Sequence, residues 1–356
     1  MRTYLVTGGA GFIGSNIAIR LKRDVAGVRV IALDNLRRRG SELNVPRLKA
    51  AGVEFVHGDV RQKEDLEVAA ALDCLIECSA EPSVLAGYAS TPAYVIDTNL
   101  TGALNCLELA RRHAAAFVFL STSRVYPIRG LNDLAFREIE TRYDLVDEQP
   151  ARGASAEGVS EEFPLEGGRS IYGATKLAAE ILVQEYVDVY GLRAVINRCG
   201  VVTGPWQMGK EDQGVVAFWV ARHVFERPLA YIGYGGTGKQ VRDILHVDDL
   251  YRLLQLQMQR LEEIGGQVFN VGGGRPVSVS LRELTALCEQ ATRRRLDIRP
   301  VPETRPGDVR AYVSDCRRIR ELTGWTPQLR AEHIVDELTR WMVDNRAQLE
   351  AVLAHA

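Results

Sequence analysis

The sequence lacks several features that identify whole classes of protein. Of its 356 residues, 44 are Lys or Arg and 46 are Asp or Glu, so the formal net charge is only −2. This balance gives no global argument for binding nucleic acid or an anionic membrane surface. No apolar run approaches membrane-spanning length, and we interpret residues 1–6 as a first strand rather than a signal peptide. We therefore expect a cytoplasmic protein without nucleic acid or membrane partners.

A metal-binding pattern is also missing. The chain has six scattered cysteines, namely Cys74, Cys78, Cys106, Cys199, Cys288 and Cys316. Cys74 and Cys78 are close in sequence, but no second nearby pair or histidine completes a ligand set. We expect no metal site, and we interpret these thiols as buried or idle.

A glycine-rich segment near the N-terminus is the strongest local signal. Residues 7–14 read Thr-Gly-Gly-Ala-Gly-Phe-Ile-Gly, between an apolar strand expected at 2–6 and apolar residues at helical spacing over 12–21. In such a turn Gly8 permits a tight bend, Gly11 lets backbone approach a pyrophosphate, and Gly14 lets helix and strand pack. Free N–H groups at the helix start attract anionic oxygens. This context favours a dinucleotide loop over an ordinary turn.

An acidic residue supports this interpretation. The second apolar strand, expected at 28–33, ends in Asp34, twenty residues beyond Gly14, where a carboxylate can reach the adenosine ribose hydroxyls. This favours NAD, although Asp34 could simply cap a loop. Arg37, Arg38 and Arg39 follow and could instead pair with a 2′-phosphate, so NADP stays an alternative.

Strands and helices then alternate along the first half of the chain. Further strands are expected at 53–57, 74–78, 116–120 and 195–198, and helices at 66–72 and 91–115. This alternation predicts an α/β fold with a Rossmann-type doubly wound parallel sheet.

Asp59 follows the third strand and could accept a hydrogen bond from the adenine amino group or cap a helix. Ser121, Thr122 and Ser123 follow the fifth strand and could contact a ligand or form a turn.

Residues 127–170 break this pattern. Gly, Pro, Glu and Arg are interspersed there with little apolar periodicity. A long irregular stretch inside a compact domain is usually a functional lid or disordered. We expect a mobile flap over the ligand crevice of the sheet, because the segment leaves this crevice at Tyr126 and returns to it at Tyr172.

Tyr172 and Lys176 form the candidate proton-transfer pair. They are four residues apart at the start of a helix expected to run to about Tyr190, so they share one face. A phenol with a reference pKa of roughly 10 is a poor base, but a nearby ammonium and a nicotinamide cation favour the phenolate. The alternative is a surface pair at helical spacing, which the cofactor loop makes less attractive.

Together these segments resemble the extended short-chain dehydrogenase/reductase family, which includes nucleotide-sugar epimerases and dehydratases. The resemblance spans nearly the whole chain and rests on residues 7–14, Asp34-Asn35-Leu36, Gly58-Asp59-Val60, Asn99, Ser121-Thr122-Ser123, residues 172–176, residues 240–249 and Arg305-Pro306-Gly307-Asp308. Segments 55–61, 140–143, 212–214 and 238–243 are most similar to the CDP-tyvelose (CDP-paratose) 2-epimerase subfamily. Two departures stand out: Glu77-Cys78-Ser79-Ala80 replaces a His-Leu-Ala-Gly type sequence, and Val201 replaces an asparagine of many 4-epimerases.

The resemblance implies a role for each candidate site residue. Tyr172 would be the base, Lys176 would bind the nicotinamide ribose and lower the pKa of Tyr172, and Thr122 would hydrogen-bond the reacting hydroxyl. Further cofactor contacts would come from Gly8, Gly11, Phe12, Ile13, Gly14, Asp34, Asn35, Asp59, Val60, Cys78, Ser79, Ala80 and Asn99. The substrate would contact Thr122, Ser123, Gln213, Arg242, Arg305 and Asp308. Ser123 and Arg124 occupy the places of the acid pair in 4,6-dehydratases, so elimination would lack its acid and base.

We expect two domains and a homodimer. Residues 1–198 plus 240–272 would bind NAD, and residues 199–239 plus 273–356 would form a smaller α/β domain for the nucleotide sugar. The helix expected at 171–190 has little polar face, and one apolar side could pack on the same helix of a second subunit, with the helix at 91–115.

The leading functional hypothesis is an NAD-dependent nucleotide-sugar epimerase, with a nucleotide-diphosphate sugar as substrate and C2 as the inverted carbon. A 4-epimerase is the nearest alternative, and a nucleotide-sugar dehydrogenase or reductase that releases reduced cofactor is another. A cofactor-binding protein without catalysis would not need Tyr172 and Lys176.

Overall fold

The expected doubly wound sheet is present and has seven strands. The computed structural model describes residues 2–88 and 91–353 of the chain. Its sheet has the strand order β14-β10-β5-β4-β1-β2-β3, and the central pairs from β5 to β3 are parallel. The order reverses at β1 (Thr3–Thr7), since β2 lies on one side of it and β4 on the other. In such sheets the ligand crevice opens at the carboxyl ends of the strands beside this reversal.

The residues divide into two units, which are described separately. The first comprises the described residues of Met1–Thr122, Ile171–Arg198 and Tyr251–Phe269. The second comprises those of Ser123–Ser170, Cys199–Leu250 and Asn270–Ala356. A few elements cross these limits, because β14 and α8 each contain residues of both units.

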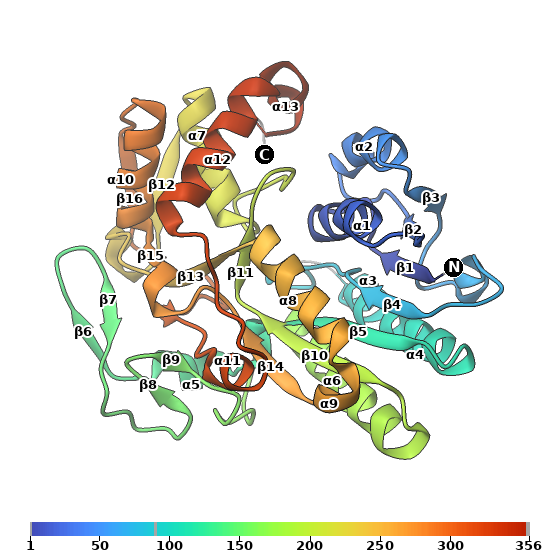
Figure 1. Ribbon diagram of the computed structural model, residues 1–356. Helices are drawn as coiled ribbons and strands as arrows, with labels where there is room; N and C mark the ends of the chain where they lie inside the picture. Colours follow the sequence, from blue (N-terminus) through green and yellow to red (C-terminus); the bar gives the residue numbers. More distant parts are fainter. Residues whose placement is uncertain (1, 89–90, 354–356) are drawn as a thin grey trace. The chain divides into compact units, whose positions relative to one another are not determined.

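The first unit holds the sheet and the helices that cover it (Figure 1). Its strands, with those that run on into the second unit, are β1, β2 (Arg29–Asp34), β3 (Glu54–His57), β4 (Cys74–Glu77), β5 (Ala116–Thr122), β10 (Ala194–Cys199) and β14 (Val268–Val271). Its helices are α1 (Phe12–Asp24), α2 (Asn44–Ala50), α3 (Ala93–Ile96), α4 (Gly102–Arg112), α6 (Ile171–Tyr190), α8 (Val247–Gln259) and α9 (Leu261–Ile264). The apolar strands bury their side chains on both faces, as parallel strands between helices require. Phe117 and Phe119 of β5 are wholly buried in this core.

Two helices expected in this unit differ from the structure. The expected helix at 66–72 is wrong, since only a 3₁₀ turn at Lys63–Leu66 forms there. The long helix expected at 91–115 is divided, with a π-helical turn at Asp97–Thr101 between α3 and α4. Such turns are frequent at functional sites. This one contains the buried Asn99, whose side chain bonds are described below.

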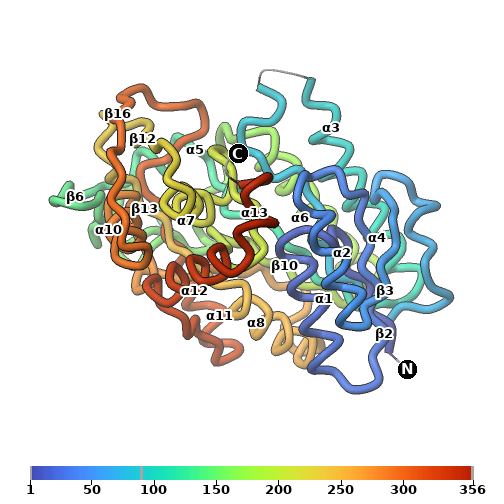
Figure 2. The backbone as a smooth tube through the Cα atoms, turned by 90° about the horizontal axis from the view of Figure 1, so that it is seen from above, coloured from blue at the N-terminus to red at the C-terminus, as the bar shows by residue number. Residues whose placement is uncertain are grey.

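The second unit contains a smaller sheet flanked by helices. In this sheet β13 (Val241–His246) pairs with β11 (Val201–Thr203), β15 (Ser278–Ser280) and β17 (Ala311–Tyr312). A separate parallel pair joins β12 (Leu229–Ile232) to β16 (Ile298–Val301). The helices are α5 (Ile128–Asn132), α7 (Val215–Phe225), α10 (Leu281–Thr292), α11 (Arg317–Thr323), α12 (Ala331–Asp344) and α13 (Arg346–Leu353). Helices α7, α10 and α12 lie side by side (Figures 1 and 2).

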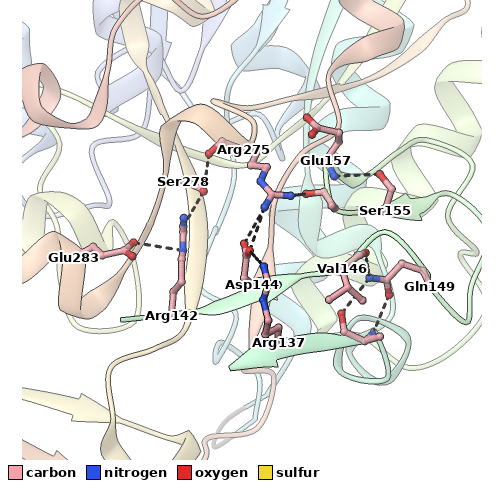
Figure 3. A network of polar contacts seen from close by, with 12 residues as sticks. Arg137, Arg142, Asp144, Val146, Gln149, Ser155, Glu157, Arg275, Ser278 and Glu283 are labelled. Atoms are coloured by element: carbon pink, nitrogen blue, oxygen red, sulfur yellow. Dashed lines mark hydrogen bonds and ion pairs between the residues drawn. The ribbon is translucent and has the colours of Figure 1, made fainter. Parts of the chain in front are cut away.

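The expectation that residues 127–170 are irregular is wrong in part. They contain α5 and two hairpins, β6–β7 (Phe136–Glu138 and Tyr143–Leu145) and β8–β9 (Ala154–Ser155 and Gly158–Val159). Figure 3 shows how the first hairpin is attached: Arg142 bonds to Ser278 and lies 3.5 Å from a Glu283 oxygen, while Arg275 pairs with Asp144. These partners are charged and distant in sequence, so no periodicity signals them. Movement as a flap stays a prediction.

Candidate active site

The glycine-rich loop connects β1 to α1 as expected. Gly8 has φ +61°, and a Cβ on it would lie 2.8 Å from the Cys78 carbonyl oxygen. A Cβ on Gly14 would lie only 2.2 Å from the Gly8 carbonyl oxygen, so α1 packs directly on the loop backbone. Gly11 is the N-cap of α1 and has no side chain to cap it, while Phe12 and Ile13 form its first turn. The loop therefore presents backbone N–H groups at a helix start, which suits an anionic diphosphate.

Asp34 lies at the end of β2 with its carboxylate fixed beside this loop. One oxygen accepts a hydrogen bond from the Ala10 amide (3.1 Å) and the other from the Leu36 amide (2.8 Å). Burial raises the pKa of this carboxyl above its ordinary value, against these hydrogen bonds. The guanidinium of Arg37, the first candidate for a 2′-phosphate, lies 3.9 Å from the centre of the Tyr94 ring. This arrangement is better suited to a ribose hydroxyl at Asp34 than to a phosphate.

Asp59 forms a polar cluster with Asn35 after the third strand. The Asn35 amide donates to Asp59 (3.0 Å), and the Arg61 guanidinium donates to it at 3.0 and 2.6 Å. Arg61 accordingly holds the pKa of Asp59 well below its ordinary value. Asp59 also accepts from the Arg61 amide, which closes a local turn. The helix cap considered for Asp59 is not formed, since the 3₁₀ turn Lys63–Leu66 has Gln62 as its N-cap and no side-chain cap bond. Val60 is buried below the cluster and contacts Gly102.

The three candidate proton-transfer residues all lie within the first unit. Thr122 is the last residue of β5 and is buried, and Tyr172 is the second residue of α6. One turn later Lys176 is almost completely buried, with its ammonium 3.1 Å from a Glu77 carboxylate oxygen and 4.0 Å from the centre of the Phe119 ring. Glu77 was noted in the sequence only as a departure from a family pattern. Its contact with Lys176 depends on the packing of α6 against the sheet, where α6 contacts β5, and local sequence does not encode this packing.

Asn99 is hydrogen-bonded to Glu81 in the segment 78–81, which follows β4. The Asn99 side chain accepts from the Glu81 amide (2.8 Å) and donates to the Thr175 hydroxyl (3.2 Å), so it connects this segment to α6. Ser79 lies 2.9 Å from both Thr7 and Glu77, and the Cys78 amide donates to the Thr7 carbonyl. Ala80 is half-buried in the same segment. These contacts place Cys78, Ser79 and Ala80 beside the glycine loop, whereas Asn99 supports the helix that carries Tyr172.

In the second unit, most candidate substrate residues gather at one loop. Arg242 on β13 donates to the Val309 carbonyl (2.8 Å), and burial lowers its pKa to about 10. Arg305 lies 3.4 Å from Asp308 and 3.3 Å from Glu211. Arg124, which the sequence interpretation assigned no binding role, donates to the Gly307 carbonyl at 2.9 Å. Three guanidinium groups therefore lie at residues 305–309, where two donate to backbone carbonyls and the third is paired with carboxylates. Guanidinium N–H donors are of the kind that binds a diphosphate.

The other two candidate substrate residues lie elsewhere in this unit. Ser123 begins a 3₁₀ turn, Ser123–Val125, directly after β5. Gln213 exchanges backbone hydrogen bonds with Lys210 just before α7, whose N-cap is Gly214 with φ +72°. Gln213 thus directly precedes the N-cap of α7, and its contact with substrate stays a prediction.

Comparison with known proteins identifies the family. A family model described as "NAD dependent epimerase/dehydratase family" matches residues 4–272. The chain belongs to this family. It is 32% identical to a CDP-paratose 2-epimerase of Salmonella typhi over 95% of the chain and 98% of that protein. It is also 29% identical to a dTDP-glucose 4,6-dehydratase of Streptomyces niveus, over 97% of the chain and 94% of that protein.

Solved structures agree with this assignment. A UDP-glucose 4-epimerase of Thermus thermophilus in complex with NAD has a TM-score of 0.75 and 29% identity, covering 96% of the chain and 99% of that structure. The family resemblance and the Rossmann-type fold expected from the sequence are both confirmed. No helix within the described parts of the chain is long and apolar enough to cross a membrane.

The residues of this chain can hold NAD, the cofactor of its family. A side chain at Gly8 or Gly14 would collide with protein backbone, so the tight loop at the start of α1 requires glycine at both positions. Asp34 offers a fixed carboxylate for ribose hydroxyls, and Asp59 with Asn35 offers acceptors for an adenine amino group. Lys176 carries three N–H donors, and Glu77 needs only one of them. NAD is thus the cofactor that both the family and the donor set indicate.

Proposed function

We propose that this protein is a nucleotide-sugar epimerase that inverts C2 of a CDP-hexose, as in a CDP-tyvelose 2-epimerase. The observation that carries the proposal is the group of Tyr172, Lys176 and Thr122 in the NAD-binding unit, without an acidic pair after Thr122. In this chain Ser123 and Arg124 stand there, and Arg124 is bonded to the Gly307 carbonyl. The similarity to a CDP-paratose 2-epimerase over nearly the whole chain supports the choice of C2 and of a cytidine nucleotide.

The proposed reaction assigns each step to a side chain. Thr122 hydrogen-bonds the reacting hydroxyl, and Tyr172, as a phenolate, removes its proton. Lys176 provides the positive charge that favours the phenolate and holds the nicotinamide ribose. The glycine loop, Asp34 and Lys176 would hold NAD, which would supply a hydride acceptor for oxidation at the same carbon and a hydride donor for reduction from the opposite face. Tyr172 then gives the proton back, so the net redox change is zero.

The second unit would bind the substrate diphosphate. Arg242, Arg305 and Arg124 lie at residues 305–309, and guanidinium groups bind phosphate oxygens through paired N–H donors. Asp308 would keep Arg305 oriented, since the two side chains are already paired. Gln213 and Ser123 would supply further polar contacts to the sugar nucleotide.

We also propose a homodimer. Exposed apolar side chains remain on α6, where Ile181 is 53% and Val189 65% exposed, and on the neighbouring α4, where Leu104 is 37% exposed. A second copy that packs these helices against their equivalents would cover them with one self-complementary surface.

Isotope labelling tests the reaction. Turnover of an unlabelled CDP-hexose in heavy water would be followed by NMR and mass spectrometry. Hydride storage predicts inversion with no deuterium at the inverted carbon and no loss of water from the sugar. Deuterium at that carbon would instead require proton abstraction from carbon, and a 4-keto-6-deoxy product would make the protein a dehydratase.

NMR of the product and the absorbance of the reaction mixture separate the remaining candidate activities. Inversion at C4 in place of C2 would identify a 4-epimerase, the activity named for the NAD complex from Thermus thermophilus. Absorbance of reduced nicotinamide that accumulates with each turnover would identify a dehydrogenase. The UDP-linked hexose serves as the matched control for the nucleotide, since it keeps the ribose and the diphosphate and changes only the base. The dTDP-linked hexose changes the base and also lacks the ribose 2′-hydroxyl.

A further inference from the structure

Glu77 is a buried carboxylate that the proposed reaction does not use. It is the last residue of β4, stands opposite Thr7 in the sheet register, and is 1% exposed. A carboxylate buried to this extent is strongly destabilising unless it is paired and hydrogen-bonded. Its position is also where the sequence departs from the family's His-Leu-Ala-Gly type segment. The chain therefore keeps a costly group at one specific place.

The contacts of this carboxylate lead to Lys176 and to the glycine loop. One oxygen lies 3.1 Å from the Lys176 ammonium, and the other lies 2.9 Å from the Ser79 hydroxyl. Ser79 in turn lies 2.9 Å from the Thr7 hydroxyl at the end of β1. The Lys176 ammonium also faces the Phe119 ring at 4.0 Å. One oxygen of Glu77 is thus bonded to Ser79, while its other oxygen is paired with Lys176.

We propose that Glu77 is a positioning residue, which fixes the Lys176 ammonium and sets the net charge beside Tyr172. The inference rests on the proposed function, because it assumes that Tyr172 is the base. An ammonium has three N–H donors, and the bond to Glu77 uses one, so two stay available for other partners. A pair that is buried and anchored through Ser79 fixes the lysine far better than solvent could.

Among the described residues, the neighbouring elements bring neutral groups to the pair. The groups that face it are the Thr7 and Ser79 hydroxyls, the Phe119 ring and the Cys106 thiol of α4. Burial raises the pKa of Cys106 well above its ordinary value, so this thiol stays neutral. Tyr172 lies one helical turn before Lys176 on α6. The charges that act on its phenol from this cluster are therefore those of Lys176 and Glu77.

The charges of Lys176 and Glu77 determine the direction in which a substitution of Glu77 should shift the pH dependence of turnover. A positive charge at Lys176 favours the phenolate of Tyr172, whereas the negative charge of Glu77 opposes it. Removal of that negative charge should let Tyr172 work at lower pH. The acidic limb of the pH–rate profile of Glu77→Gln should therefore move down by about half to one pH unit.

Two variants and one control test the proposal on the full-length protein. Glu77→Gln removes the charge and keeps an acceptor, while Glu77→Asp keeps the charge and withdraws the carboxylate by one methylene. Glu54→Gln is the matched control, because Glu54 is also an ion-paired carboxylate of this sheet but is largely exposed, 2.8 Å from Arg29. The measurements are kcat and KM for the CDP-hexose across neutral pH and the two pH units on either side, retained NAD after purification, and the melting temperature.

The expected results distinguish positioning from a merely structural role. Glu77→Asp should lower kcat several-fold at unchanged KM, with the acidic limb unmoved, and Glu77→Gln should move the limb down. Glu54→Gln should change neither quantity. A Glu77→Gln limb that is unmoved or moves upward would overturn the proposal, as would a wild-type kcat for Glu77→Asp. If Glu77→Gln does not fold, the kcat of Glu77→Asp decides alone.

Failure of this inference is separable from failure of the proposed function. Tyr172→Phe tests the base directly and should be inactive across the same pH range. If Tyr172→Phe turns over normally, the proposed mechanism fails whatever Glu77 does. If Tyr172→Phe is inactive while both Glu77 variants behave as wild type, only the role of Glu77 is refuted.

Discussion

A second buried ion pair on α6 allows a quantitative prediction about stability. Glu180 on this helix accepts three hydrogen bonds from Arg198 of β10, at 3.2, 3.0 and 2.7 Å, and another from the Ser121 hydroxyl of β5. The side chains of Glu180 and Arg198 are only 2% and 6% exposed. Glu180→Ala would remove the carboxylate that pairs with this buried guanidinium. Breaking a buried pair in this way costs about 3–5 kcal/mol.

The assay should report on this helix rather than on the whole chain. Because the protein has two units, a single free energy of unfolding need not describe it. Hydrogen exchange of the α6 backbone amides measures the local opening free energy instead. A loss of about 3 kcal/mol should accelerate exchange of the slowest α6 amides roughly 10²-fold. The same amides in the wild-type protein provide the reference.

A matched control and a clear refutation accompany the measurement. Glu54→Ala breaks the pair between Glu54 and Arg29, whose side chains are 46% and 33% exposed, respectively. Exposed pairs contribute only about 0–1 kcal/mol to stability. Exchange in that variant should change less than about fivefold. If Glu180→Ala accelerated α6 exchange no more than Glu54→Ala, the claim that burial makes the Glu180 pair structurally important would be wrong.

Three further predictions concern the proposed function. Tyr172→Phe should keep the fold and NAD but lose about two to four orders of magnitude in turnover, since only the proton-transfer oxygen is removed; more than a tenth of wild-type activity would contradict this. Ile181→Arg, a change on the exposed face of α6, should convert a dimer seen by light scattering into a monomer, whereas Leu322→Arg on α11, also at an exposed apolar side chain, should not. Hydrogen exchange in residues 127–170 should slow when nucleotide sugar binds if they move as a flap, and equal rates would refute this movement.

The sequence predicted the sheet because its signals are local. The apolar strands, the glycines of the loop and the carboxylate of Asp34 each follow from spacing within about thirty residues. Spacing also placed Tyr172 and Lys176 on one helix face. The boundaries of the helices were less accurate, because the π turn at Asp97–Thr101 depends on how Asn99 bonds to Thr175 and Glu81. Such contacts form only when distant segments pack together.

What the sequence could not show is which charges meet. Glu77 reaches Lys176 across 99 residues, and Arg142 of the β6–β7 hairpin reaches Ser278 across 136. Arg124 was considered only as the absence of an acid, although it donates to the loop that contains Asp308. Ion pairs and hydrogen bonds at such separations leave no periodic pattern, so tertiary structure is needed to find them.

The spacing of polar residues on α6 shows how the sheet fixes the helix that carries Tyr172. Tyr172, Lys176 and Glu180 recur every four residues, so they lie on one face, about 6 Å apart along the axis. Lys176 bonds to the end of β4, while Glu180 bonds to β5, the strand that ends in Thr122, and to β10. An apolar face alone could slide or rotate slightly against the sheet, whereas two charged pairs with directional bonds fix both the rotation and the height of the helix. Since misplacement of about 1 Å can cost 10²-fold in rate, these two pairs are the elements through which the sheet would hold Tyr172 and Thr122 in reacting positions. Loss of both pairs should therefore lower kcat by more than the product of the two single losses, because either pair alone still restrains the helix.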